Sequence, residues 1–320
     1  MELTSINKFR IAAVAVLGIV VIGMLAWPLA APADPMAPVR AGNIGAAGTL
    51  LLLVLAFGLG FAGYFIAWPH GREIGILTVP FGLTVWAGRS GPLRVLTQAH
   101  AEPFEREALA FSLRFEAVYW LLLVAAGFAG VLVAQYLRTP PQESGKAPGE
   151  KRKSMGDSGL LRLLPADLPS YLLTGLLALV AAVPISHFFV GVFVQDVAPS
   201  ENATLTQPAT GQIVFGVVAA FAVAAFVVKK FIDLSYVWPV LGSIFLIGFA
   251  QSLHGGAETI RQFAETRPAT FFPHSVLALL PIQLVALGSL GSVIGFWLAV
   301  RYDWWRQHES GVGADSPRPA

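Results

Sequence analysis

Histidines able to bind a metal ion or a haem gather in the second half of the sequence. The candidates are His187, His254 and His274, with Glu258 near them, and imidazole is a common ligand of both cofactors. No paired-histidine motif occurs, because His254 and His274 lie twenty residues apart across a polar stretch. The competing interpretation places these histidines at a membrane interface, hydrogen-bonded to loop backbone. The sequence favours that second interpretation, so we expect no catalytic residues, metal or haem.

A second group of candidate residues lies within apolar segments. Large polar side chains are costly inside a membrane and often mark a pathway for ions or substrates. Gln283 is the deepest of them, and Glu116 lies just inside the end of its segment. Prolines within spans free backbone groups, which then line a cavity or allow a helix kink. The candidate pathway or cavity therefore comprises Pro80, Pro239, Ser243, Gln283 and Glu116.

The composition indicates a protein that is mostly embedded in lipid. Hydrophobic residues make up 55% of the chain and charged residues only 12%, against roughly 25% charged in soluble domains. Cysteine is absent, which excludes disulfides and thiolate metal sites. A net charge of +2 is too small to predict nucleic-acid binding. Arginine outnumbers lysine and Ala, Gly and Pro are abundant, which hints at a bacterial inner-membrane protein.

The sequence predicts an all-α integral membrane protein with about eight transmembrane helices. A span needs about 20 apolar residues, at about 1.5 Å of rise each. Ile74–Ala87 is short, so a re-entrant segment is an alternative to a full crossing. The first segment ends in a small-residue sequence, which leaves a cleaved signal peptide as its alternative. The eight segments are Ile11–Ala31, Ala46–Trp68, Ile74–Ala87, Phe115–Leu137, Leu168–Val194, Ile213–Val228, Tyr236–Ser252 and Ser275–Val300.

The eight segments form two sets of four with matching order. Each segment of the second set starts 157 to 167 residues after its counterpart in the first. Because each set has an even number of crossings, both halves share one orientation, which predicts a parallel repeat. We expect a membrane half at 1–138, a flexible basic cytoplasmic linker at 139–167, a second membrane half at 168–303 and a disordered cytoplasmic tail at 304–320.

The distribution of positive charge predicts the orientation in the membrane. With both termini in the cytoplasm, 14 of the 21 Lys and Arg residues fall on the inner side. This count also favours a full crossing by Ile74–Ala87, because otherwise the basic linker would face outward.

Three functions are compatible with this architecture. The first is a non-catalytic subunit or scaffold of a membrane complex, with the lipid bilayer and other subunits as its partners. The second is a transporter or permease with a pathway between the two halves. The third is a membrane electron carrier that binds haem or metal through His187, His254 and His274. The scarcity of buried polar groups places them in that order.

Overall fold

Every regular element that the structure describes is a helix. The computed structural model describes residues 5–100, 102–138, 168–194, 208–256, 258–259, 272 and 274–312. The first part of the chain forms α1 (Ser5–Gly18), the π-helical η1 (Ile19–Leu25), the 3₁₀ turns η2 (Trp27–Leu29) and η3 (Ala41–Asn43), α2 (Ala46–Ile66), α3 (Gly71–Gly75), α4 (Thr78–Arg89), α5 (Leu93–Ala99) and α6 (Pro103–Arg138). The second part forms α7 (Leu168–Phe193), α8 (Thr210–Ile232), α9 (Val237–His254), the 3₁₀ turn η5 (Ser275–Ala278) and α11 (Pro281–Val312).

Seven helices are long and apolar enough to cross a membrane, which makes this a multi-pass membrane protein. They are α1 continued through η1, α2, α6, α7, α8, α9 and α11. Each contains a window of 18 apolar residues, which at about 1.5 Å per residue covers most of the hydrocarbon thickness. The helical membrane class predicted from the sequence is therefore confirmed, with seven such helices among the described residues.

The segment predicted as a short third span forms two consecutive helices, α3 and α4. The 12 residues of α4 are too few to place it among the seven long apolar helices. Gly71, at the start of α3, packs on Tyr64 near the end of α2. At the other end, the guanidinium carbon of Arg89 lies 4.2 Å from the centre of the Trp27 ring, just after η1. Together α3 and α4 therefore run from the end of α2 to the end of η1.

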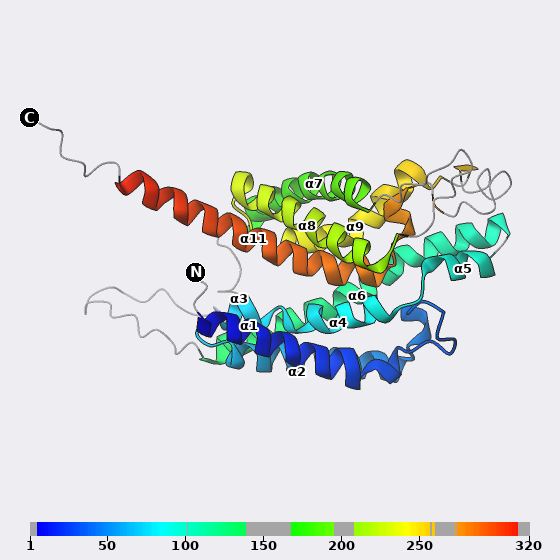
Figure 1. Cartoon of the computed structure of the whole chain (residues 1–320), viewed down its shortest axis with the longest axis horizontal. Coiled ribbons are helices and arrows are strands. Elements are labelled where there is room, and N and C mark those ends of the chain that lie inside the picture. Colours follow the sequence, from blue (N-terminus) through cyan, green and yellow to red (C-terminus); the bar gives the residue numbers. More distant parts are fainter. Residues whose placement is uncertain are drawn as a thin grey trace, which may run out of the picture.

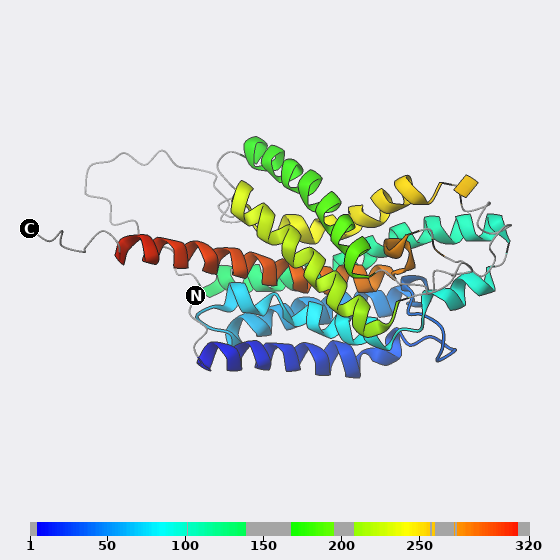
Figure 2. The ribbon, with the colours of Figure 1, turned by 45° about the horizontal axis from the view of Figure 1, so that its top comes forward.

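Most helices run along the long axis of the molecule, although α7 and α8 are inclined to it, and α1 begins at the same end of the molecule at which α11 ends (Figure 1 and Figure 2). We call this the termini end, and the opposite end, where η1 ends and α11 begins, the far end. Figure 2 shows α11 running between α7 and α8 on one side and α1 to α6 on the other. Most of the apolar part of α11 is buried, whereas less than half of the apolar part is buried in the other six spans. The core of the protein therefore surrounds α11.

Two helix pairs approach closely through glycines. A Cβ atom added to Gly60 of α2 would lie 1.9 Å from the carbonyl oxygen of Gly127 in α6. In the second half, a Cβ added to Gly295 of α11 would lie 2.0 Å from the carbonyl oxygen of Ala222 in α8. Only glycine permits such contact between backbones, which is how packing holds helices together in lipid.

Two predicted segments differ from the structure or lie outside it. The last helix continues through residues 304–312 to Val312, where the sequence predicted the start of a disordered tail. Asp303, directly before this extension, accepts a hydrogen bond from the Lys230 ammonium group, which ties this part of α11 to the end of α8. The predicted linker at 139–167 and the end of the tail at 313–320 lie outside the described residues, as does most of the connection between His254 and Pro273.

Candidate functional site

Three histidines from separate elements meet near the far end of the second half. His187 lies in the last two turns of α7, His254 is the last residue of α9, and His274 immediately precedes η5. One ring nitrogen of each lies within 4.8 Å of the others, and all three side chains are half-buried. The helices α7 and α9 pack against each other, and η5 contacts both of them. Tertiary packing therefore creates a three-histidine cluster that has no local sequence motif.

The three rings are stacked almost in parallel. The centroid of the His274 ring lies 4.4 Å from those of both His187 and His254, with interplanar angles of 8° and 2°. A metal ion lies in the plane of each imidazole that binds it, and distinct parallel planes share no point. Donors on one tetrahedral Zn²⁺ also lie roughly 3.3 Å apart, since each Zn–N bond is about 2.0 Å long. Metal binding therefore requires rotation of the rings and a closer approach.

The hydrogen bonds of the cluster leave a buried nitrogen of His187 available to an ion. Nε2 of His187 is buried and has no hydrogen-bond partner among the described residues. A buried polar atom of this kind is costly unless something binds it. Nδ1 of His274 accepts a hydrogen bond from the backbone N–H of Val276 at 3.3 Å. With Nδ1 accepting, the neutral His274 ring carries its proton on Nε2.

The packing around the rings provides the space for this arrangement. Gly191 follows His187 by one helical turn, and a Cβ atom there would lie 3.2 Å from Nε2 of His274. A side chain at this position would press against the ring. Phe249 of α9 packs edge-on to His187, with centroids 5.3 Å apart. The absence of a side chain at residue 191 therefore admits His274 to the cluster.

The environment keeps His274 neutral. Burial, together with the neighbouring His187 and His254 rings, lowers the pKa of His274 from 6.5 to about 4. A neutral imidazole has the lone pair that a metal ion needs, whereas a protonated one has none. His274 is therefore in the metal-binding protonation state across the physiological pH range.

The donor set suits a transition metal ion better than a hard cation or a haem. The cluster contains only imidazole nitrogens, which suit Zn²⁺, Cu²⁺ or Ni²⁺, whereas Mg²⁺ and Ca²⁺ prefer oxygen ligands. Glu258 is exposed and is not part of the cluster. Haem bound by two histidines needs one nitrogen pointing at each face of the porphyrin. Rings stacked face to face at 4.4 Å do not offer that geometry.

The residues predicted to line a pathway are spread through the bundle. Glu116 is buried on α6 and binds the Arg40 guanidinium at 2.7 Å, which fastens the segment before η3 to that helix. Gln283 accepts a hydrogen bond from the Leu280 N–H at 3.0 Å and donates to the Ala87 carbonyl at 3.4 Å. Its amide thus joins the start of α11 to the end of α4.

The other pathway candidates are also buried in helix packing. Ser243 donates to the Val240 carbonyl at 2.7 Å within α9. Pro80 and Pro239 are buried in α4 and α9. None of the five predicted pathway residues lines either of two pockets between α6, α7 and α9. A pathway through these residues stays a prediction.

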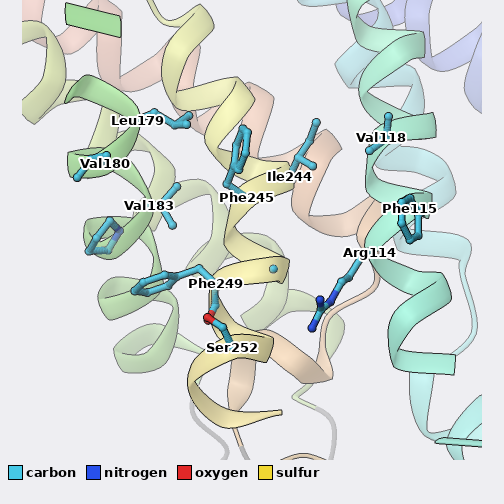
Figure 3. Close-up of a pocket in the computed structure, with 12 residues that line it drawn as sticks. Arg114, Phe115, Val118, Leu179, Val180, Val183, Ile244, Phe245, Phe249 and Ser252 are labelled. Atoms are coloured by element: carbon cyan, nitrogen blue, oxygen red, sulfur yellow. The ribbon is translucent and has the colours of Figure 1, made fainter. Parts of the chain in front are cut away.

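Gly191 could not be predicted from the sequence, because its importance depends on a ring from another element. Arg114, which lines two pockets between α6, α7 and α9 (one of them shown in Figure 3), and Gln251, which lines one of them, were also not among the predicted site residues. The boundary between charged and apolar residues at Arg114 was the one available signal. No known protein family, curated protein or solved structure matches this chain.

Proposed function

We propose that this multi-pass membrane protein binds a divalent transition metal ion through His187, His254 and His274. The convergence of three ring nitrogens within 4.8 Å carries the proposal. The unpartnered Nε2 of His187 supports it, because a bound ion would satisfy that buried atom. Three protein ligands leave a fourth position open for water or a substrate, as in catalytic zinc sites.

Binding of an ion requires the rings of the cluster to move. In the stacked arrangement the ring nitrogens are too far apart to bind one ion, and the imidazole planes are nearly parallel. Binding of an ion therefore requires the rings to rotate. Ligation by Nε2 of His274 moves its proton to Nδ1, and that atom then no longer accepts the Val276 N–H. Ligation by Nδ1 displaces the same hydrogen bond. The backbone amide of Val276 therefore reports on metal binding in either case.

We further propose that α3 and α4 form an eighth crossing and that the chain is a parallel repeat of two four-helix halves. The contacts of α3–α4 at both ends of the bundle support the crossing. In the first half α2 packs on α6 and α1 on α4. In the second half α8 packs on α11 and α7 on α9, which repeats the pattern.

We propose that both termini face the cytoplasm of a bacterial inner membrane. The excess of Lys and Arg in the segments that the sequence predicts to lie inside supports this orientation. The three-histidine cluster then faces the outside, where it meets ions before they enter the cell. A cysteine-accessibility map of the cysteine-free chain tests this orientation directly.

Metal binding thus moves from third to first among the three functions considered. The reason is the tertiary convergence of the histidines, which the sequence spacing does not reveal. The roles of complex subunit and transporter stay predictions, and a metal site at the outer face is compatible with either. The fourth coordination position is where a partner or a substrate would bind.

The test is isothermal titration of the purified protein in detergent with Zn²⁺ and Cu²⁺. We expect one ion per chain, with Cu²⁺ bound more tightly than Zn²⁺ as the usual order of stability requires. Replacing any cluster histidine by Ala weakens binding by more than tenfold. His100, whose Nδ1 lies 2.8 Å from the Leu96 carbonyl oxygen, provides the matched control His100→Ala. Equal affinities for the cluster variants and the control would refute the proposal.

A further inference from the structure

The 3₁₀ turn η5 joins the three-histidine cluster to the buried start of α11. His274 lies directly before this turn, and its Nδ1 caps the turn by accepting the Val276 N–H at 3.3 Å. Two backbone hydrogen bonds close the turn. The Leu277 N–H donates to the His274 carbonyl at 3.0 Å, and the Leu279 N–H donates to the Val276 carbonyl at 3.3 Å. The position of the His274 ring therefore helps to set the shape of η5.

Gln283 extends this connection to α4, on the other side of α11. Its Oε1 accepts the N–H of Leu280, directly after the turn, at 3.0 Å. Its Nε2 donates to the Ala87 carbonyl in the last turn of α4 at 3.4 Å. The last carbonyls of a helix lack partners within it, and the Gly91 N–H donates to the Ala37 carbonyl instead. The Gln283 amide therefore supplies the hydrogen bond that the Ala87 carbonyl needs.

The whole connection runs through the protein core. Val276, Leu279, Leu280 and Gln283 are each at most 3% exposed. A close-packed interior has little room to absorb a displacement, so a shift of one residue is passed to its neighbours. The apolar part of α11 is the most buried of the seven spans, which makes that helix a fixed support. A movement of η5 is therefore taken up at its junction with α11, where Leu280 is bonded to Gln283.

Metal binding supplies such a movement. The ring nitrogens lie within 4.8 Å of one another, whereas donors on one Zn²⁺ ion lie roughly 3.3 Å apart. His187 belongs to the long helix α7 and His254 to the end of α9, so moving either ring far requires moving a helix. His274 is carried by a short 3₁₀ turn, whose hydrogen bonds have poorer geometry than those of an α-helix. His274 is therefore the ligand that moves, and η5 moves with it.

We propose that metal binding at the three-histidine cluster loosens the contact between α11 and α4. The ion draws His274 away from Val276, the displaced turn breaks the bond between Leu280 and Gln283, and the Gln283 amide releases the Ala87 carbonyl. This proposal rests on the metal site proposed above and adds a means of regulation to it. The ion then acts as a signal from the far end of one half of the chain to a helix of the other half.

Coupling between two sites is reciprocal, which gives the proposal a distinctive sign. If metal binding breaks the Gln283 bonds, a protein that lacks those bonds must bind the metal ion more tightly. Gln283→Met removes both bonds and keeps the length of the side chain. We expect this variant to bind Zn²⁺ about fivefold more tightly than the unaltered protein, the factor that one ordinary hydrogen bond contributes. A residue that merely supported the cluster would weaken binding when replaced.

Isothermal titration with Zn²⁺ in detergent measures that change. Gln251→Met is the matched control, because Gln251 is also a buried glutamine that joins two helices. It is 5% exposed, and its Nε2 donates to the Ala110 carbonyl at 2.8 Å, outside the connection through η5. We expect no tighter binding in this control. A Gln283→Met protein that binds Zn²⁺ no more tightly than the unaltered protein, or no more tightly than the control, would overturn the proposal.

Hydrogen–deuterium exchange of the unaltered protein tests the coupling without relying on a variant. Zn²⁺ should slow exchange around His187 in α7 and speed it at Val276, at Leu280 and in the last turn of α4. In Gln283→Met, Zn²⁺ should no longer change exchange in α4. Protection around His187 without any change in α4 would refute the coupling and leave the metal site standing. Failure to bind Zn²⁺ in the titration would refute the metal site, and the coupling with it.

Discussion

The close contact between α8 and α11 predicts how much a substitution at Gly295 lowers the free energy of unfolding. Gly295 faces the carbonyl oxygen of Ala222, and a Cβ atom there would lie 2.0 Å from that oxygen. Ordinary contact begins at 3.4 Å, so Gly295→Ala is about 1.4 Å too close. The obstacle is backbone, which cannot rotate away as a side chain would. The two helices must therefore separate.

The cost of that separation exceeds the gain from the new side chain. Overpacking a close-packed interior typically costs about 1–3 kcal/mol, and a backbone obstacle puts this variant at the upper end. Replacing glycine by alanine in a helix returns up to about 1 kcal/mol. We therefore expect Gly295→Ala to lower the free energy of unfolding by about 2 kcal/mol. Gly248→Ala, with nothing within 4 Å of its Cβ, should raise it by up to about 1 kcal/mol.

Reversible unfolding in mixed detergent, followed by circular dichroism, measures both variants. The pair shares one chemical change in the same kind of helix, so the difference between them isolates the helix contact. If the two variants have the same stability, or if Gly295→Ala is the more stable, the close approach of α8 and α11 is wrong.

Three further predictions concern the site and its support. The His274 ring resonances of metal-free protein should titrate near pH 4 in NMR. The free energy of unfolding should fall as the pH falls from about 6.5 to 4, because the unfolded chain takes up the proton at a higher pH than the folded protein does. Titration of His274 near pH 6.5 would contradict the burial of the cluster. Gly191→Val should weaken zinc binding about tenfold, because the new side chain presses on the His274 ring. Gly211→Val, at an open position, should leave zinc binding unchanged. Equal zinc affinities of the two variants would show that Gly191 does not support the cluster. Glu116→Ala should lower the free energy of unfolding by about 1–3 kcal/mol, because it leaves Arg40, whose side chain is 22% exposed, with Ser112 as a hydrogen-bond partner but without its ion pair. An unchanged unfolding curve would show that the ion pair is not stabilising.

The spans could be predicted because their cause is local. A run of apolar residues long enough to cross the hydrocarbon is visible in any window, and seven of the eight predicted segments form helices long enough to span. The departures come from tertiary packing. No local sequence signal predicts the π-helical segment at η1 or the division of Ile74–Ala87 into α3 and α4.

The site shows the same division between local and distant causes. The sequence grouped His187, His254 and His274 at one face of the second half, because each lies near a segment end on the same side. The sequence favoured histidines hydrogen-bonded to loop backbone over a metal site, because metal ligands from distant segments form no recognisable motif. The ion pair of Glu116 is a second example, because no local pattern in the sequence identifies its partner. The partner of Glu116 is Arg40, from a loop far away in the sequence.

X-ray absorption at the zinc edge of the loaded protein tests the central claim most directly. We predict three imidazole nitrogens at about 2.0–2.1 Å from the ion, with the outer-shell scattering of imidazole rings, and a decrease of that scattering in His187→Ala. The Val276 amide resonance should shift on loading in the same sample. A zinc ion surrounded by oxygen ligands alone, or an unchanged spectrum in the His187 variant, would contradict the three-histidine site.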